Sequence, residues 1–408
     1  YIALGKGLAA AGHNVRLLSH ENYEKLIITH GLDFRPVKGD VQAVMETPEM
    51  RQVVEHGNFI AINRVAAKHA KQAAVYWAQD GLAACRGVDL ILAGLGGFAI
   101  AVALAEKLDV PVAQAYLVPF SPTRDFPSVL LPTAAPRLGG LFNRVTHHLT
   151  RQMMWTSFRD GDKLSRRQVL DLPAPPITGP YRSPRLNQYP VLYGFSPSVV
   201  PRPGDWDERQ VITGYWFLEP DPGWQPPEPL AEFLAQGSPP VYVGFGSMSN
   251  RKPQETTALV LQALAHSGQR GVILSGWGGL GAADLPDTVL AVDSVPHSWL
   301  FPRMAAVVHH AGAGTTAAGL RAGVPSVLTP FFGDQFFWGQ RVYDLGVGPA
   351  PIPRKELTAE ALGAAIRRAV TDAEMRRRAA ALGARIRDED GVTRAVDVLQ
   401  SAMPMPPN

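Results

Sequence analysis

A strand, a glycine-rich turn and a helix follow one another late in the chain, and this unit constrains the fold most. Residues 305–308 form an apolar run typical of a buried strand, and residues 317–322 are typical of a helix. Between them, residues 309–316 read His-His-Ala-Gly-Ala-Gly-Thr-Thr. Glycines at such a turn let a ligand approach the backbone, and the free N–H groups at a helix start attract an anion. We therefore expect a phosphorylated ligand to bind at this turn.

Length and charge narrow the class of protein. A chain of 408 residues is too long for one ordinary domain, so we expect two domains. The formal net charge is only +3, and the arginine run at 376–378 lies near acidic residues on a helical stretch. Such a run indicates a solvated helix face, so we expect no nucleic-acid partner.

Cysteine content and hydropathy are typical of an intracellular protein. The single cysteine, Cys85, excludes an internal disulfide and a cysteine-based metal site, and we expect it to be a small semi-buried side chain. The best membrane candidate, residues 90–105, has 16 uncharged residues, short of the roughly 20 that span a bilayer. We see no signal-peptide pattern at the N-terminus and expect a cytoplasmic location and a monomer.

Strand-like and helix-like segments alternate in both halves of the chain, which is typical of α/β domains with parallel sheets. Seven prolines between residues 219 and 240 exclude regular structure throughout that segment. We therefore predict an N-terminal domain at 1–218, a linker at 219–240, a second domain at 241–390 and a C-terminal segment at 391–408. A ligand cleft is expected between the two domains.

The N-terminus departs from the usual order of a doubly wound domain, which begins with a central strand and a Gly-rich turn before the first helix. Here residues 1–11 already read as that helix, Gly12 as its C-cap and residues 14–19 as the next strand. We expect the first strand to lie upstream of Tyr1, so that the sequence is a truncated gene product or an incomplete record. Two neighbouring strands would then lack their central partner.

A long helix is predicted at 140–170, because apolar residues such as Val145 and Leu149 recur at helical spacing along one face. An apolar ligand could bind beside this helix. The walls of its site would then be residues 153–155 of the helix and the proline-rich loop at 120–136. Core packing is an equal alternative for the methionines in that stretch.

One interpretation of the glycine-rich turn is a nicotinamide or flavin dinucleotide site. The pattern Gly312-x-Gly314-x-x-Ala317 fits, and Asp334 follows Gly314 by 20 residues, where a ribose-binding acid could lie. The pattern is short, however, and it falls late in the second domain rather than at its first strand. A P-loop is excluded because the turn lacks the Gly-Lys-Ser/Thr sequence.

A nucleotide-sugar site is the interpretation that more residues support. A diphosphate needs a cradle of N–H groups and hydroxyls, a sugar needs paired polar groups, and a base needs a backbone edge and a flat neighbour. The glycine turn, the Asp-Gln pair after it and an earlier Val-Pro-His segment could supply these three parts. The candidate residues are His310, Gly312, Gly314, Thr315 and Thr316 for the diphosphate, Asp334 and Gln335 for the sugar, and Val295, His297 or Trp277 for the base.

The stretch SVPHSWLFPRMAAVVHHAGAGTTAAGLRAGVPSVLTPFFGDQFFWGQRV resembles the donor-binding region of GT-B glycosyltransferases in the UDP-glycosyltransferase superfamily. Sterol 3-beta-glucosyltransferases and antibiotic-aglycone glycosyltransferases are the branches that it resembles. The N-terminal half is similar more loosely, through residues 3–20 and 89–119. The resemblance implies a GT-B fold, with two Rossmann-like doubly wound domains facing each other across a cleft. It also implies that the helix within 391–408 crosses back to the N-terminal domain.

The resemblance further implies roles for residues of the second domain. Many relatives bind the ribose with an acid eight residues after the motif histidine, but that position is Ala318 here, as in the sterol-type branch. The ribose contact is therefore left open. The implied contacts are His310 and residues 312–316 with the diphosphate, Ser247 near the phosphates, Asp334 and Gln335 with the donor sugar, Val295 and His297 with the uracil, and Trp277 with the nucleoside.

The general base that deprotonates the acceptor lies, in this family, in the turn after the first strand. That segment would precede Tyr1, so we assign no catalytic residue in this chain and expect it to bind donor poorly or not to turn over. His13 and His20 lie near the N-terminus at the ends of a helix and a strand. These positions are typical of solvent-facing histidines.

The implied reaction is inverting transfer of a hexose from a UDP-sugar, with UDP-glucose as the expected donor, to a hydroxyl of an apolar acceptor such as a sterol, polyketide or lipid. We expect no resident cofactor, since the UDP-sugar is a co-substrate, and no metal, since a helix start and His310 would stabilise the leaving diphosphate. Such an acceptor could bring the protein into transient contact with a membrane. Two alternatives stay open: a nucleotide-sugar epimerase on the same fold, and a non-catalytic binder of sugar nucleotides or lipids.

Overall fold

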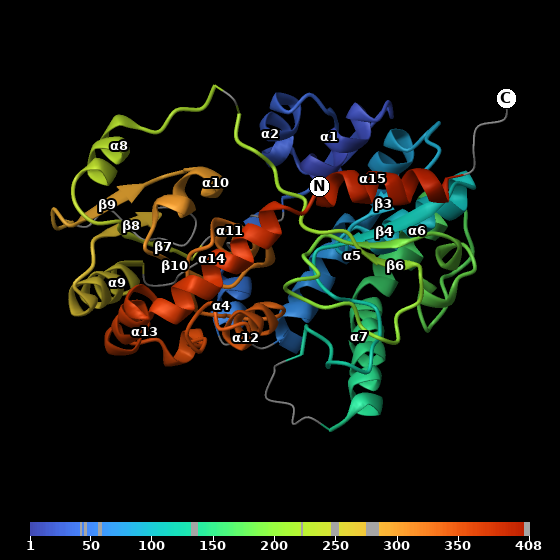
Figure 1. Cartoon of the computed structure of the whole chain (residues 1–408). Coiled ribbons are helices and arrows are strands. Elements are labelled where there is room, and N and C mark those ends of the chain that lie inside the picture. Colours follow the sequence, from blue (N-terminus) through green and yellow to red (C-terminus); the bar gives the residue numbers. More distant parts are fainter. Residues whose placement is uncertain are drawn as a thin grey trace.

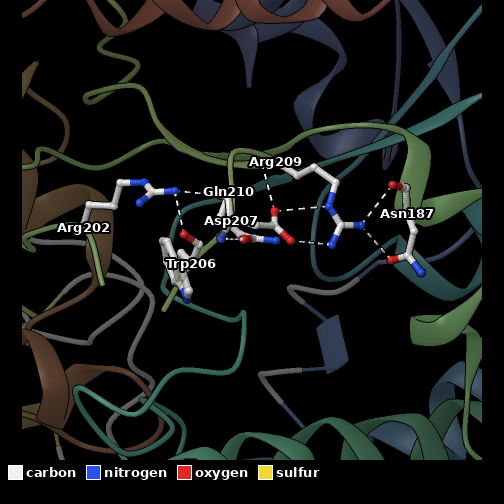
Figure 2. A network of polar contacts seen from close by, with 6 residues as sticks. All are labelled: Asn187, Arg202, Trp206, Asp207, Arg209 and Gln210. Atoms are coloured by element: carbon white, nitrogen blue, oxygen red, sulfur yellow. Dashed lines mark hydrogen bonds and ion pairs between the residues drawn. The ribbon is translucent and has the colours of Figure 1, made fainter. Parts of the chain in front are cut away.

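The computed structural model of the protein describes residues 1–40, 43–44, 47–55, 59–131, 138–221, 223–245, 253–274 and 285–403. These residues form two α/β units, with the C-terminal unit at the left of Figure 1 and the N-terminal unit at the right. All the strand pairs that the described residues form are parallel, in sheets of two, four and five strands. The two-unit α/β fold predicted from the alternating pattern is confirmed.

The C-terminal sheet places its first strand at the centre. Its order is β11-β10-β7-β8-β9, so the chain runs outward from β7 to β9 and then returns to add β10 and β11 on the other side. The carboxyl ends of these parallel strands meet at one edge, and the order reverses between β7 and β10. Doubly wound sheets bind ligands in the crevice outside such a reversal. The strands are β7 Val241–Gly244, β8 Gly271–Leu274, β9 Val289–Val292, β10 Ala306–His309 and β11 Ser326–Leu328.

Helices cover the C-terminal sheet, and this burial explains its continuous apolar strands. β7 and β10 are buried along their whole length, as is usual in parallel sheets covered on both faces. Val243 and Val308 pack in one cluster with Leu264 of α9 and Ile366 of α13. The helices of this unit are α9 Pro253–Ser267, α10 His297–Leu300, α11 Ala313–Ala322, α12 Gln335–Asp344, α13 Ala359–Thr371 and α14 Ala373–Arg387.

The N-terminal unit holds two separate sheets. One has the order β3-β4-β5-β6 and the other pairs β1 with β2, so β1 and β3 are both edge strands. Buried residues of β4 such as Ala113 and Tyr116 form the centre of the larger sheet. The elements are β1 Arg16–Ser19, β2 Asp33–Pro36, β3 Ile91–Ala93, β4 Val112–Tyr116, β5 Val191–Tyr193, β6 Gln210–Ile212, α1 Ile2–Ala10, α2 Glu24–Thr29, α4 Pro48–Glu55, α5 Phe59–Ala84, α6 Phe98–Leu108 and α7 Gly140–Ser165.

The helix predicted at 140–170 is present as α7, followed by a wider helical turn at Arg166–Leu170. α5 and α7 each have 26 residues and contact each other along the N-terminal unit. Val145 and Leu149 do share a face of α7, but their side chains are 44% and 62% exposed. None of the helices in the described part of the chain is both long enough and apolar enough to cross a membrane.

The proline-rich segment at 219–240 contains one short helix, α8 (Glu228–Ala235). A proline in its first turn is compatible with a helix, because the N–H groups there have no partner inside the helix. Leu230 of α8 is fully buried in one cluster with Tyr242 and Leu300. The second half of the segment therefore packs with the C-terminal unit.

A C-terminal helix, α15 (Gly391–Ala402), leaves the C-terminal unit and lies along the N-terminal one (Figure 1). Its residues Val396 and Leu399 pack in one cluster with Leu4 of α1. The chain thus passes between the units twice, once before α8 and once before α15. At these crossings Gly214 and Gly391 are so close that a Cβ on Gly391 would lie 2.6 Å from the carbonyl carbon of Gly214.

Aromatic side chains from both units fill the interface between them. The rings of Phe126 and Phe337 have centroids 5.7 Å apart, and those of Phe195 and Trp338 are 6.2 Å apart. Trp338 is 1% exposed and Phe337 8% exposed. These two side chains of α12 therefore serve mainly as packing between the units.

Candidate functional site

The predicted site residues follow the carboxyl ends of the five strands of the C-terminal sheet. Because those ends meet at one edge, segments far apart in the sequence come together there. The segment after β10 and the segment after β7 flank the point where the strand order reverses. In chain order, Ser247 follows β7, Trp277 follows β8, Val295 and His297 follow β9, residues 310–316 follow β10, and Asp334 and Gln335 follow β11; Ser247 and Trp277 lie outside the described residues.

The start of α11 provides unpaired backbone donors. Gly312 is its N-cap and supplies no side-chain hydrogen bond. The first hydrogen bond of the helix runs from the Thr316 N–H to the Gly312 carbonyl oxygen, at 2.9 Å. The N–H groups of Ala313, Gly314 and Thr315 therefore point beyond the helix end, where the helix dipole favours negative charge. This is the arrangement that binds phosphate in many nucleotide-binding proteins.

His310 lies directly before this helix start. Its Nδ1 is buried and has no hydrogen-bond partner among the described residues. Burial lowers the pKa of His310 to about 4, with a smaller effect from the nearby His297, so the ring is neutral at pH 7. A Cβ on Gly312 would lie 2.4 Å from the His310 Nε2, so the glycine lets the ring sit against the backbone. A phosphate oxygen would complete the hydrogen bonds of this side chain.

His309, next to it, is part of the core. Its side chain is fully buried, and its Nδ1 accepts a hydrogen bond from the Ala311 N–H at 3.2 Å. Ala311 adopts a φ of 65°, which is uncommon for a residue with a side chain, and this hydrogen bond holds it there. His309 therefore shapes the turn, and the His310 ring lies against Gly312 at the helix start.

The two threonines of the turn differ in position. Thr315 is half-buried at the helix start. Thr316 is fully buried, and its Oγ1 has no partner within the part of the chain that the structure describes. Its hydroxyl lies beneath the turn, so Thr315 is the better placed of the two to meet a bound anion.

His297 and Val295 follow β9 at the same edge. The His297 ring stacks on Phe301 with centroids 4.3 Å apart, and its Nε2 lies 3.5 Å from the Tyr242 hydroxyl. Burial lowers the pKa of His297 to about 4. Val295 is 6% exposed, so only its backbone is available to a ligand. The Val-Pro-His segment is thus a rigid edge that a flat base could lie against.

Asp334 ends the turn after β11 and caps α12. Gly333 before it has a φ of 62°, a conformation that suits glycine. The Oδ2 of Asp334 accepts a hydrogen bond from Nε1 of the buried Trp338 at 2.9 Å, which fixes the carboxyl group. Burial raises the pKa of Asp334 to about 6, and the hydrogen bond from Trp338 opposes that rise. The carboxylate is ionised at pH 7 and can accept hydrogen bonds from hydroxyl groups.

Gln335 points back into its own turn. Its Oε1 accepts hydrogen bonds from the N–H groups of Phe331 and Phe332, at 2.7 and 3.3 Å. The residue is 4% exposed. In this conformation Gln335 closes its own turn and holds the backbone that presents Asp334.

A cleft of about 1080 Å³ lies between the two units. On the C-terminal side His297, Gly314 and Ala318 line it, so two of the predicted site residues face the same space. On the N-terminal side its walls are largely apolar. They include Tyr1, Leu26, Leu117, Trp216, Phe217 and Leu218.

Sequence patterns did not predict several residues of the cleft wall. Glu219 of the linker and Arg321 of α11 both line the cleft and form an ion pair at 2.5 Å. Arg321 lies three residues after Ala318, on the same face of the helix. The helical spacing from the glycine turn could have predicted that Arg321 lies on the ligand side of α11. No local sequence pattern predicts a position for Glu219.

His13 and His20 do not line the cleft. His13 Nε2 lies 3.2 Å from Nε2 of Gln400 at the surface, and His20 Nδ1 lies 3.0 Å from the Val37 carbonyl oxygen. Neither side chain is placed to act on a ligand there. These two histidines are therefore not candidates for the catalytic base.

A helix start with free N–H groups at the reversal point of a doubly wound sheet is typical of nucleotide-binding proteins with α/β domains. Comparison with known proteins narrows this class. Residues 272–395 match the family described as Erythromycin biosynthesis protein CIII-like, C-terminal domain. A sterol 3-beta-glucosyltransferase of Arabidopsis thaliana is 35% identical over 417 residues, which cover 99% of this chain and 66% of the relative. A sterol 3-beta-glucosyltransferase of Aspergillus fumigatus is 38% identical over 417 residues, which cover 98% of this chain and 28% of the relative.

A solved glycosyltransferase structure has a similar fold. The glycotransferase of kitacinnamycin superposes on 99% of this chain with a TM-score of 0.66 at 19% identity, and 95% of that chain is covered. The chain belongs to the UDP-glycosyltransferase family of GT-B glycosyltransferases, so the predicted resemblance is confirmed. It spans 66% of the plant relative's length and 28% of the fungal one's.

Proposed function

We propose that this protein transfers glucose from UDP-glucose to a hydroxyl group of an apolar acceptor, with inversion at the anomeric carbon. Two relatives that share more than a third of its residues are named sterol 3-beta-glucosyltransferases, which supports the reaction class. The UDP-sugar is a co-substrate in this proposal, and the protein needs no resident cofactor.

One observation carries the proposal. At the carboxyl edge of the C-terminal sheet, the uncapped start of α11 and the His310 ring, whose Nε2 lies against Gly312, are neighbours. Backbone N–H groups and a neutral imidazole together suit a diphosphate better than a single carboxylate, because they supply several donors without a metal ion.

The same groups support bond cleavage. In the proposed reaction the acceptor oxygen bonds to the anomeric carbon as the bond from that carbon to the diphosphate breaks. The proton of the acceptor hydroxyl passes to a general base, to which we assign no residue. Negative charge then grows on the leaving diphosphate. The N–H groups of Gly314 and Thr315, the dipole of α11 and the His310 ring stabilise that charge where it develops.

Asp334 suits the sugar half of the donor. Trp338 holds its Oδ2, and the remaining lone pairs of the carboxylate can accept hydrogen bonds from sugar hydroxyls. A carboxylate that is buried and pre-oriented selects polyhydroxylated ligands over apolar ones. Gln335 supports this geometry by closing the turn.

The cleft suits an apolar acceptor. Leu26, Trp216 and Phe217 line its N-terminal wall, opposite the donor side. A volume of about 1080 Å³ accommodates a nucleotide sugar together with part of an acceptor of sterol size.

Sugar transfer tests the proposal. The protein is expressed from the complete reading frame that contains this sequence and incubated with UDP-glucose and a sterol, and the product is identified by mass spectrometry and by the anomeric coupling in NMR. We expect a β-glucoside, a loss of about a hundredfold in rate for Asp334→Asn, and the wild-type rate for His13→Ala. Release of an epimerised UDP-sugar without acceptor would indicate an epimerase, and donor binding without any product would indicate a binding protein.

A further inference from the structure

The outer face of α7 presents apolar side chains to solvent. Leu141, Val145 and Leu149 recur every four residues along this face and are 73%, 44% and 62% exposed. Leu138, just before the helix, is 58% exposed. Ile177, 71% exposed, adjoins them, because Gln152 of α7 donates a hydrogen bond to its carbonyl at 3.0 Å. We call these five residues the α7 patch.

In the first half of α7 the buried face is polar, which reverses the usual pattern of a surface helix. Thr146, His147 and Thr150 are 1–2% exposed. Thr146 Oγ1 accepts from the Ser128 N–H at 2.8 Å, and His147 Nε2 lies 3.0 Å from the Phe126 carbonyl oxygen. The hydroxyls and the imidazole thus anchor the loop at 120–131, and the leucines remain outside. Core packing therefore does not explain the patch.

The segment that carries most of the patch is basic, and the acids nearest to it are Asp125 and Asp160 at its two ends and Asp205, which lies close enough to affect His147. Residues 126–159 contain four arginines and no aspartate or glutamate. Arg144 and His148 are exposed and lie three residues after Leu141 and Val145, so they flank the patch on the same face. Arg182 is close enough to His148 to affect its pKa, which is lowered mainly by burial and also by the neighbouring arginines. A surface with this charge complements anionic phosphates.

The shape suits a flat partner. In Figure 1 the first turns of α7 extend below the rest of the N-terminal unit, so the patch lies at a protruding end of the molecule. Aliphatic side chains at a protrusion, with basic residues such as Arg144 beside them on the same helix, are typical of helices that lie in a membrane interface. Protein interfaces are richer in aromatic residues, and the α7 patch has none.

We propose that the α7 patch docks the protein on the surface of a membrane that contains anionic phospholipids. The leucines enter the boundary between headgroups and acyl chains, and Arg144 with its neighbours contacts the phosphates. Because α7 also packs against the loop at 120–131, docking brings the N-terminal unit next to the bilayer. The docking does not depend on which sugar is transferred or on whether transfer occurs.

Vesicle sedimentation tests the proposal with the full chain. We expect the protein to sediment with vesicles of equal parts phosphatidylcholine and phosphatidylserine, and less with phosphatidylcholine alone or at high salt. The double variant Leu141→Gln, Leu149→Gln should lose about tenfold or more of this binding, and Arg144→Gln should lose binding only to the vesicles with phosphatidylserine.

The matched control is Ile28→Gln, which removes an apolar side chain that is 54% exposed on α2, away from α7. It should bind vesicles like the wild type. Unchanged melting temperatures would show that all variants fold. The proposal is overturned if the wild type stays in the supernatant with both kinds of vesicle, or if the double variant sediments as the wild type does. A dimer in light scattering that the double variant abolishes would also overturn it, because the patch would then join two copies of the chain.

Discussion

Burial of the Asp334 carboxyl links stability to pH. Its pKa is about 6 in the folded protein against 3.8 in the unfolded chain, so the unfolded state ionises first as the pH rises. The folded protein therefore loses stability between these two values and loses no more above pH 6. A shift of this size corresponds to about 2–3 kcal/mol at most.

Asp334→Asn should remove this loss while keeping the hydrogen bond from Trp338. We expect the variant to gain stability relative to the wild type as the pH rises from about 4 to 8, by about 2 kcal/mol. Urea unfolding at the two pH values measures the difference. An equal difference between variant and wild type at both values would contradict the assigned burial.

Gly312 permits the position of His310. A Cβ there would lie 2.4 Å from the His310 Nε2, so Gly312→Ala must displace the ring. We expect an affinity for UDP that is about tenfold lower, because one charge-assisted hydrogen bond is lost. The melting temperature should change little, since the ring is at the end of a side chain. Gly96→Ala, where a Cβ meets nothing within 4 Å, is the control in titration calorimetry.

At the scale of elements, apolar runs predicted the strands that are buried on both faces. Residues 241–245, 271–274 and 289–292 are apolar runs that predict buried strands, and they correspond to β7, β8 and β9 within one or two residues. β2 was missed because Asp33–Pro36 is mostly exposed and contains charged residues and a proline. The sequence also predicted α7 correctly, but periodicity alone does not tell which side of a helix faces water.

Gly214 and Gly391 lie at the two places where the chain passes between the units, and their backbones are in close contact. A Cβ on Gly391 would lie 2.4 Å from the Tyr215 carbonyl oxygen and 2.6 Å from the Gly214 carbonyl carbon. Both are backbone atoms and cannot turn away, so Gly391→Ala should cost about 2 kcal/mol or more. The melting temperature should fall accordingly, whereas Gly204→Ala, with open space around its Cβ, should leave it unchanged. Equal melting temperatures for the two variants would contradict this close approach.

At the scale of the whole molecule, the geometry of the proposed donor site was predictable because it is local in sequence. A strand, a glycine turn and a helix start lie within 18 residues, from 305 to 322, and place His310 and Gly314 together. The cleft wall was not predictable in the same way. Tyr1, Phe217 and Arg321 come from separate segments, and only the packing of the two units brings them to one cleft.

The central claim is that the segment from His310 to Thr316 holds the diphosphate of a UDP-sugar. Titration calorimetry with UDP, UDP-glucose and NAD tests it most directly, on the protein expressed from the complete reading frame that contains this sequence. His310→Ala is the variant and the surface substitution His13→Ala is the control. We predict that UDP and UDP-glucose bind, that NAD does not, and that His310→Ala weakens UDP binding about tenfold or more while His13→Ala has no effect. Binding of NAD without UDP, or equal UDP affinity for His310→Ala and the wild type, would contradict the claim.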